Sequence, residues 1–253
     1  MKIIDIRETS APLGSTMRNA FIDFSKMTLS VVAVLTDVVR DGKPVVGFGF
    51  TSNGRYAQGG VLRERLIPRL LEAEPESLVD DTGGNFDPAH VRACLMKNEK
   101  PGGHGERAFA VGALDAAIWD AVAKIEEKPL YRVVAERFNN GDFDTQVPVY
   151  PGGGYYDPDK GLAGLKAEMQ GYRDAGYTLM KMKIGGAPLD EDLARIEAAL
   201  EVAGGGENLA VDANAALDLD GALKYAGAMA GYGLAWFEEP IDPLDYEAHA
   251  DLA

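Results

Sequence analysis

The feature that most limits the fold of this chain is a strand-then-helix pattern that repeats through residues 147–252. Strand-like runs are predicted at 147–150, 177–184, 208–211 and 233–237, and amphipathic helices at 161–175, 190–203, 218–230 and 244–252. Strands that alternate with helices in this way lie parallel, because each helix carries the chain back to the start of the next strand.

The spacing of these units favours a barrel over an open sheet. Met182 and Val211 are 29 residues apart, and Val211 and Phe237 are 26 apart. A TIM-type (β/α)-barrel averages about 30 residues per unit. A doubly wound sheet is the competitor, but Gly152-Gly153-Gly154 lacks the full dinucleotide-binding fingerprint.

The first 140 residues follow a different pattern. Leu29–Val39 and Pro44–Phe50 are apolar, β-rich runs on either side of an Asp-Gly turn, which predicts a hairpin. Arg107–Lys128 carries one apolar stripe and is the clearest helix, and further helices are predicted at 59–72, 87–97 and 130–138. This segment therefore has the pattern of an α+β domain.

The turn-rich Asn139–Asp142 marks the boundary between the two patterns. We expect an α+β domain at 1–140 and four βα units at 141–253. Four units are the first half of a barrel, so the predicted fold class is α/β with a truncated TIM-type barrel.

Two lysines one residue apart, Lys181 and Lys183, stand in a run apolar enough to be a buried strand. Side chains alternate faces along a strand, so both ammonium groups project to the same face. Two ammonium groups buried together disfavour each other's charge, which suits a site where a lysine accepts a proton near neutral pH. The alternative is an edge strand with two solvated lysines.

Carboxylates follow the next two strands. Asp212 comes after the strand at 208–211, and Glu238 comes after the strand at 233–237. The carboxyl ends of barrel strands share one rim, so Asp212 and Glu238 would occupy equivalent positions on it. Neighbouring carboxylates repel each other unless a cation lies between them, and oxygen ligands suit Mg²⁺. The alternatives are an Asp212 that caps a helix or forms a turn, and a Glu238-Glu239 pair that is solvated in a loop.

The composition limits the partners. A formal net charge of −15 argues against nucleic acid and against an anionic membrane surface, because both need clustered basic residues. The single cysteine, Cys94, excludes an internal disulfide. No run approaches the roughly 20 apolar residues of a membrane span, and the first residues lack a signal-peptide pattern. We expect a cytoplasmic protein that acts on a small molecule.

These residues resemble the mandelate racemase branch of the enolase superfamily. The motifs that carry the resemblance are Lys181-Met182-Lys183, Asp212-Ala213-Asn214, Glu238-Glu239-Pro240, Leu114–Asp120 and Pro129-Leu130-Tyr131. Further stretches are similar to the D-tartrate dehydratases of that branch, namely residues 18–24, 52–56, 100–107 and 183–188. The resemblance covers the whole chain and implies a capping domain followed by the barrel.

The resemblance implies a role for each matching residue of the barrel. Lys183 would be the general base, and Lys181 its electrostatic partner near the substrate carboxylate. Asp212 and Glu238 would be two Mg²⁺ ligands, and the metal would stabilise the enolate that forms when an α-proton is removed. For Lys183 to accept a proton, its pKa must fall from about 10.4, and Lys181 and the metal would both lower it.

The resemblance also implies contacts to the far end of a hydroxy-dicarboxylate substrate. Asn19, Asn53 and Lys100 of the capping domain would make them, with Tyr155 or Tyr156 at the barrel mouth. A dianionic substrate has two negative ends, which Lys100 and the metal site would match. The alternatives are two turn-forming asparagines and a solvated lysine.

Two functional groups of the family are not found in the chain. Its third metal-binding glutamate would fall about one period beyond Glu238, past Ala253, and its general-acid histidine belongs to the seventh strand. His90, His104 and His249 do not replace that histidine. We expect residues 1–253 to be a fragment without dehydratase activity of its own, and we assign the activity to the parent protein.

The expected function is a Mg²⁺-dependent acid-sugar dehydratase, a hydro-lyase that gives a 2-oxo acid. An epimerase or cycloisomerase of the same family is the alternative, and an inactive, self-associating fragment is the non-enzymatic one. The family implies a homo-oligomer, since relatives assemble into dimers or octamers.

Overall fold

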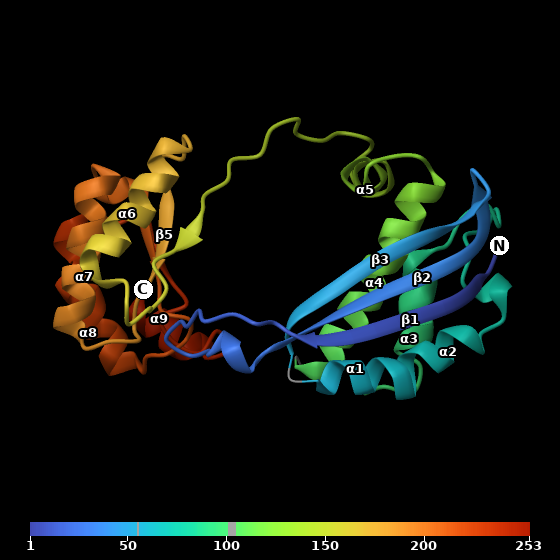
Figure 1. The fold of residues 1–253 in the computed structure, drawn as a ribbon, viewed down its shortest axis with the longest axis horizontal. Coiled ribbons are helices and arrows are strands. Elements are labelled where there is room, and N and C mark those ends of the chain that lie inside the picture. Colours follow the sequence, from blue (N-terminus) through green and yellow to red (C-terminus); the bar gives the residue numbers. More distant parts are fainter. Residues whose placement is uncertain (55, 101–104) are drawn as a thin grey trace. The chain divides into compact units, whose positions relative to one another are not determined.

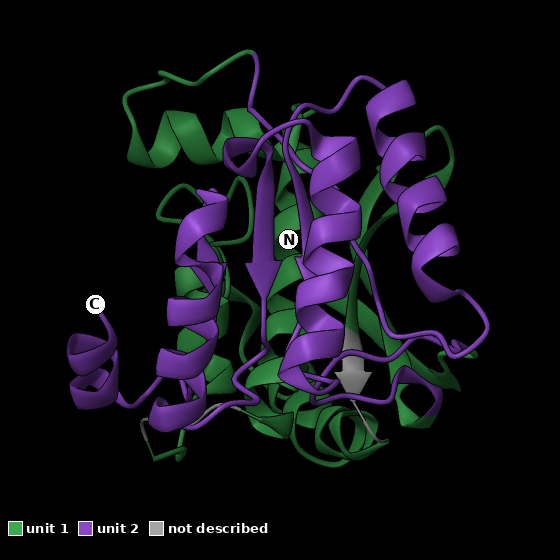
Figure 2. Cartoon of the chain, turned by 90° about the vertical axis from the view of Figure 1, so that its left-hand side faces the viewer, with its two compact units in different colours: residues 1–14, 26–145 green, residues 15–25, 146–253 purple. Residues whose placement is uncertain are grey.

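The computed structural model describes residues 1–54, 56–100 and 105–253, without the side chains of 52–54. It divides into two compact units (Figure 1). Figure 2 shows that one unit contains residues 1–14 and 26–145 and the other contains 15–25 and 146–253. The predicted domains differ from these units in the position of the boundary and in the segment 15–25. This segment joins the second unit, where the backbone amide of Tyr156 donates to the carbonyl oxygen of Arg18 at 3.0 Å.

The first unit is built on an antiparallel sheet of three strands in the order β1-β2-β3. The strands are β1 (Ile3–Pro12), β2 (Thr28–Arg40) and β3 (Lys43–Gly54). Strands β2 and β3 form the predicted hairpin. Its two turn residues, Asp41 (φ 51°) and Gly42 (φ 74°), have the positive φ that a type I′ turn requires, and Asp and Gly are residues that tolerate it.

Helices accompany this sheet in the first unit (Figure 1). They are α1 (Ala57–Val61), a π-helical turn (Leu62–Leu66), α2 (Ile67–Leu71), α3 (Pro88–Leu95), α4 (Glu106–Ile125) and α5 (Leu130–Phe138), with a 3-10 turn at Pro75–Ser77. Helices α1, α2 and α4 contact the strands of the sheet, whereas α3 and α5 contact α4. The apolar stripe predicted for α4 is confirmed, since Leu114 and Ile118 are fully buried in one cluster with Val32 and Val34. Local periodicity was enough to predict this helix and its buried face.

Helix α4 approaches β3 to backbone contact. A Cβ added at Gly49 would lie 2.1 Å from the carbonyl oxygen of Ala113, and one added at Gly47 would lie 2.0 Å from that of Ala117. Only glycine fits at such distances, so the close packing of helix on strand depends on the two glycines.

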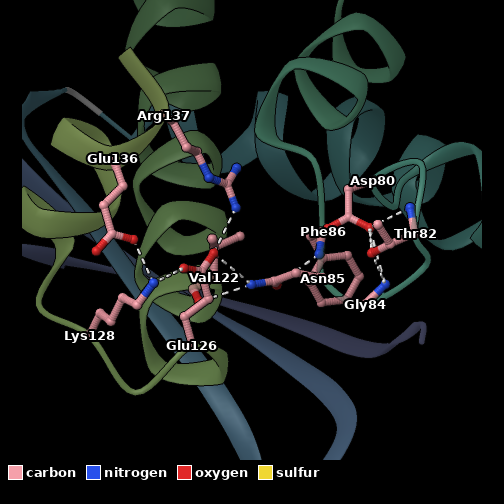
Figure 3. A network of polar contacts seen from close by, with 10 residues as sticks. All are labelled: Asp80, Thr82, Gly84, Asn85, Phe86, Val122, Glu126, Lys128, Glu136 and Arg137. Atoms are coloured by element: carbon pink, nitrogen blue, oxygen red, sulfur yellow. Dashed lines mark hydrogen bonds and ion pairs between the residues drawn. The ribbon is translucent and has the colours of Figure 1, made fainter. Parts of the chain in front are cut away.

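A polar network ties the loop before α3 to helices α4 and α5 (Figure 3). The buried amide of Asn85 donates to the carbonyl oxygen of Val122 at 3.1 Å and to Glu126 at 3.3 Å. Arg137 of α5 donates to the same Glu126 carboxylate at 2.9 Å. The loop and α5 therefore share one anchor at the C-terminal end of α4.

The second unit contains four parallel strands in the order β4-β5-β6-β7. The elements are β4 (Gly152–Gly153), α6 (Gly161–Asp174), β5 (Met180–Lys183), α7 (Leu189–Ala203), β6 (Leu209–Asp212), α8 (Leu219–Met229), β7 (Phe237–Glu238) and α9 (Tyr246–Leu252), with 3-10 turns at Gly206–Asn208 and Ala230–Tyr232. The predicted parallel arrangement is confirmed. It is an α/β fold whose sheet is consistent with part of a barrel.

One predicted strand is wrong. Residues 147–150 form no strand, and Val147 and Val149 are exposed. Pairing with β5 starts later, at Gly152 opposite Lys181. The β-branched residues favoured a strand, but β propensity reflects packing against neighbours, and no described strand pairs with 147–150.

Helix α4 spans 20 residues and includes Asp115, Asp120 and Lys124. Within the described part of the chain, no helix combines the length and the apolar character needed to cross a membrane.

Candidate active site

The ladder between β5, β6 and β7 brings predicted site residues into one row. Lys183 is the direct partner of Asp212, and Asp212 is the direct partner of Glu238. Parallel strands end at the same edge of a sheet, and each of these residues is the last of its strand. Lys181 stands two residues before Lys183, so its side chain projects to the same face.

Four charged side chains meet at this edge. Nζ of Lys183 lies 2.6 Å from Oδ2 of Asp212, and Nζ of Lys181 lies 3.1 Å from the same oxygen. Lys181 also contacts Oε1 of Glu238 at 2.5 Å. Lys183 (7% exposed) and Asp212 (1% exposed) are largely shielded from water. The structure thus brings Lys181, Lys183, Asp212 and Glu238 into one continuous array.

The pKa values of two of these groups move in opposite directions. Burial disfavours the charged form of Lys181, but hydrogen bonds to Glu238 and Asp212 outweigh it and raise the pKa of Lys181. Burial also opposes the ionisation of Asp212, yet hydrogen bonds from Lys183 and from the Asn214 amide lower its pKa. Lys181 is therefore a cation and Asp212 an anion at neutral pH.

Asp212 and Glu238 have the chemistry of two ligands of a Mg²⁺ site. The Lys181 ammonium lies between the carboxylates, so the pair already accommodates one cation. Their other oxygens are oriented by donors, the Asn214 amide at 2.8 Å from Oδ1 of Asp212 and Trp236 Nε1 at 2.9 Å from Oε2 of Glu238. Across residues 1–54, 56–100 and 105–253, no group of three or more His, Cys, Asp or Glu side chains could hold a metal. The two carboxylates match the one or two that Mg²⁺ takes from a protein.

Aromatic rings stand beside both lysines. The ring centre of Tyr155 lies 5.5 Å from Nζ of Lys183, and that of Tyr150 lies 5.9 Å from Nζ of Lys181. Tyr150 packs edge-on against Trp236, with the ring centres 5.1 Å apart. Sequence reasoning missed Tyr150 and Trp236. The signal for Trp236 was its position two residues before Glu238, which places both side chains on one face of an extended chain.

Tyr156, the alternative to Tyr155, is held by other groups. Its hydroxyl donates to Oδ1 of Asp192 at 2.6 Å and accepts from the Gly186 amide at 2.9 Å. The guanidinium of Arg195 lies 4.2 Å from its ring centre. Burial, together with the Asp192 carboxylate, raises the pKa of Tyr156, so the hydroxyl stays protonated. Tyr155 is the one of the two that stands beside the lysines.

Asn19 belongs to the second unit, in the segment 15–25. Its side-chain oxygen accepts hydrogen bonds from the amides of Phe21 at 2.9 Å and Ile22 at 2.5 Å. This is the geometry of a turn-forming asparagine. A contact between Asn19 and substrate stays a prediction.

Lys100 and Asn53 belong to the first unit. Lys100 is exposed and directly follows Glu99, whose carboxylate binds Arg65 and Arg69 at 2.8 Å each. Asn53 lies in β3, but its side chain falls outside the described residues, as does all of His104. The roles predicted for Lys100 and Asn53 are not tested by these positions.

The fold and the site together define a class of protein, in which an α+β unit accompanies βα units whose strand ends carry a lysine pair and two carboxylates. Residues 164–253 match the family model described as "Enolase C-terminal domain-like". A solved racemase from Streptomyces coelicolor A3(2) with bound magnesium is similar to this chain with a TM-score of 0.75 and 27% identity. The match covers 99% of this chain and 66% of that one. Residues 164–253 are thus an enolase C-terminal domain-like region, and the chain is similar over nearly its whole length to the mandelate racemase and muconate lactonizing branch of the enolase superfamily.

Two curated relatives show which enzymes the chain resembles. The 3,6-anhydro-alpha-L-galactonate cycloisomerase of Streptomyces coelicolor is 30% identical over 241 residues, which are 95% of this chain and 60% of the relative. The arabinonate dehydratase of Saccharolobus solfataricus is 32% identical over 187 residues, which are 73% of this chain and 46% of the relative. The chain thus spans about half of the length of these relatives.

Proposed function

We propose that the whole protein is a Mg²⁺-dependent acid-sugar dehydratase, a hydro-lyase that converts a 2,3-dihydroxy acid into a 2-oxo acid. The observation that carries this proposal is the array of Lys183, Asp212, Lys181 and Glu238 on three neighbouring strand ends. Removal of a proton next to a carboxylate needs a base and positive charge beside the developing anion, and this array contains both. The similarity to an arabinonate dehydratase supports the same reaction class.

Each residue of the array has one task in this reaction. Asp212 and Glu238 would hold Mg²⁺, which supplies positive charge that stabilises the enolate. Lys181, kept cationic by its two carboxylate neighbours, attracts the substrate carboxylate. Lys183 in its neutral form accepts the α-proton on Nζ. The electron pair of the broken C–H bond then expels the β-hydroxyl, which leaves as water after taking up a proton, and the enol tautomerises to the 2-oxo acid.

The substrate we propose is tartrate or a closely related hydroxy-dicarboxylate. The support is the resemblance of residues 18–24, 52–56, 100–107 and 183–188 to tartrate dehydratases. Asn19, Asn53 and Lys100 would contact the far carboxylate, as the resemblance implies. We assign Tyr155 to the mouth of the site, because its ring lies 5.5 Å from the Lys183 amine. A cytoplasmic homo-oligomer remains part of the same proposal.

The proposal is tested with the whole protein and a panel of sugar acids that includes the stereoisomers of tartrate. We expect a 2-oxo acid, detected as its semicarbazone, from at least one hydroxy-dicarboxylate. The reaction should stop when EDTA removes the metal and resume when Mg²⁺ is added. If no acid of the panel gives a 2-oxo acid while the protein is folded, the proposed function is refuted.

Two lysine variants test the role of Lys183. Lys183→Ala should lower kcat by about 10²–10⁴-fold, the usual contribution of a general base. Lys166→Ala is the matched control, because Lys166 lies on α6, where it pairs with Glu201. It should keep the wild-type rate.

A cycloisomerase is the second candidate, and one observation favours it. The relative that matches 95% of this chain is a cycloisomerase. Mass spectrometry of the products separates the two reactions, since an isomer has the mass of its substrate and a dehydration product is lighter by one water. A product of unchanged mass would refute the dehydratase in favour of an isomerase of the same family, either the cycloisomerase or the epimerase.

A further inference from the structure

Asp192 of α7 is a fully buried carboxylate with several hydrogen-bond donors around it. Its Oδ1 accepts from the Tyr156 hydroxyl at 2.6 Å, and its Oδ2 accepts from the Tyr225 hydroxyl at 3.0 Å and from the Gly185 amide at 2.7 Å. The guanidinium of Arg195 pairs with Oδ1 at 3.5 Å. A buried charge is kept only where such partners offset its lost hydration, and here each oxygen has at least two.

The partners of Asp192 hold the backbone directly after Lys183. Gly185 leaves β5 with φ +82°, and its amide is fixed by Asp192. The next amide, that of Gly186, donates to the Tyr156 hydroxyl at 2.9 Å. A Cβ added at Gly186 would lie 2.5 Å from a ring carbon of Tyr156, so the turn rests directly on the ring.

The same network reaches Lys183 itself and the segment that carries Tyr155. Arg195 donates to the carbonyl oxygen of Lys183 at 3.3 Å and to that of Gly154 at 2.6 Å. Gly154 directly precedes Tyr155, whose ring stands over the Lys183 amine. The Asp192 network therefore holds the backbone of Lys183, which carries the amine, and the backbone of Gly154, next to the residue that carries the ring.

We propose that Asp192, with Tyr156 and Arg195, is a positioning group that sets where the Lys183 amine and the Tyr155 ring stand relative to the substrate. The proposal rests on the role of Lys183 in the proposed function and assigns Tyr156 to positioning instead of substrate contact. The side-chain end of Lys183 is held by Asp212, and its backbone end is held by the Asp192 network. Freeing the backbone end displaces the amine, and a displacement of about 1 Å can cost roughly 10²-fold in rate.

The test compares two Tyr→Phe variants that each remove one hydroxyl bonded to a carboxylate of α7. Tyr156→Phe removes the bond to Asp192, and the control Tyr232→Phe removes the 2.7 Å bond to Glu197. We expect kcat of Tyr156→Phe to fall by about 10–100-fold, while KM changes by less than about threefold, because geometry and not binding is lost. Exchange of the substrate α-proton with D₂O should slow by the same factor. The control should match the wild type in all three quantities.

A second measurement does not depend on turnover. The rate at which an amine-directed acylating reagent modifies Lys183 is followed by mass spectrometry of the peptide that contains it. This rate should differ by at least about threefold between Tyr156→Phe and wild type, since the amine moves relative to Asp212. It should be unchanged in Tyr232→Phe. Asp192→Asn should give the same result as Tyr156→Phe. If Asp192→Asn does not fold, the test relies on Tyr156→Phe alone.

The outcomes separate this proposal from the proposed function. If the wild type is active and Tyr156→Phe equals it in kcat, exchange and labelling, positioning by Asp192 is refuted while the dehydratase stands. If the wild type turns over no acid, the proposed function fails and the labelling rates alone decide whether the network positions the amine. If Tyr156→Phe loses both kcat and thermal stability while the labelling rate of Lys183 is unchanged, Asp192 is a structural residue and the proposal is overturned.

Discussion

The indole nitrogen of Trp236 donates a 2.9 Å hydrogen bond to Oε2 of Glu238, whose other oxygen, Oε1, contacts Lys181. The two oxygens of Glu238 thus have different partners, and the indole selects which one faces the lysine. Donors that orient a metal-binding side chain typically contribute about 10- to 100-fold to metal affinity.

Trp236→Phe should therefore weaken the response to Mg²⁺. The substitution keeps a ring beside Tyr150 but removes the donor to Glu238. We expect the Mg²⁺ concentration for half-maximal activity to rise about tenfold, with a smaller change in substrate KM. Trp119→Phe changes the other tryptophan of the chain, on α4, and should leave the Mg²⁺ response as in wild type. An unchanged response in Trp236→Phe would contradict the orienting role.

Lys181→Met should make the stability of the protein depend more on Mg²⁺. The Lys181 ammonium lies between Asp212 and Glu238, so its removal leaves two carboxylates that repel each other. In EDTA we expect Tm to fall by about 2–4 °C, and Mg²⁺ should raise Tm more in the variant than in wild type. Scanning fluorimetry with and without Mg²⁺ measures both shifts, and Lys166→Met is the control. An equal Mg²⁺ effect in variant and wild type would contradict the cation-replacing role.

Asp115→Asn should stabilise the protein at neutral pH. Burial raises the pKa of Asp115 above its ordinary value, and Arg92 opposes the shift only in part. A raised folded-state pKa means that the folded state holds the proton more tightly than the unfolded chain. The contribution of the protonated Asp115 to stability is therefore fully present below the ordinary carboxyl pKa, and it is lost as the pH rises through the folded-state pKa. Asn mimics the neutral form, so Tm should rise by about 1–2 °C at pH 7.

The pH dependence supplies the control for Asp115→Asn. The gain in Tm should shrink when calorimetry is repeated below the ordinary carboxyl pKa, where wild-type Asp115 is protonated as well. Asp120→Asn on the same helix should act in the opposite direction. Its carboxylate accepts from the Phe48 amide at 2.7 Å and pairs with Lys124 at 2.5 Å. A gain for Asp115→Asn that is independent of pH would show that ionisation is not its cause.

Gly49→Ala and Gly112→Ala should change stability with opposite signs. A Cβ at Gly49 would lie 2.1 Å from a carbonyl oxygen of α4, which forces helix and strand apart. We expect the free energy of unfolding to fall by about 1–3 kcal/mol. A Cβ at Gly112 meets nothing within 4 Å, and alanine favours the helix, so a gain of about 0.4–1 kcal/mol is expected there. Urea denaturation measures both, and a loss at Gly112 as large as that at Gly49 would contradict the packing argument.

The group of Lys181, Lys183, Asp212 and Glu238 was predictable from the sequence. Each lies at or near the end of an apolar, strand-like run, the runs recur at a regular spacing, and parallel strands end at one edge of their sheet. These are local or periodic features, so no knowledge of distant contacts was needed. The helix α4 and the β2-β3 hairpin were predictable for the same reason.

Other features depended on contacts between distant segments. Residues 147–150 have strand-forming side chains but no partner strand among the described residues, and the segment 15–25 joins the second unit and not the first. The pKa of Lys181 is raised because Glu238, 57 residues further along the chain, accepts its hydrogen bond. Two lysines on one strand predicted only their mutual repulsion.

The sequence by itself determined on which strand ends the two lysines and the two carboxylates stand, because strand alternation and βα periodicity are properties of residues close together in the chain. Tertiary structure alone decided the difference between Tyr155 and Tyr156. These neighbours are chemically identical, but one ring stands over Lys183 and the other hydroxyl is bound by Asp192, 36 residues away. Such a choice depends on which groups the fold brings within hydrogen-bonding distance, and a hydrogen bond forms only at that short range.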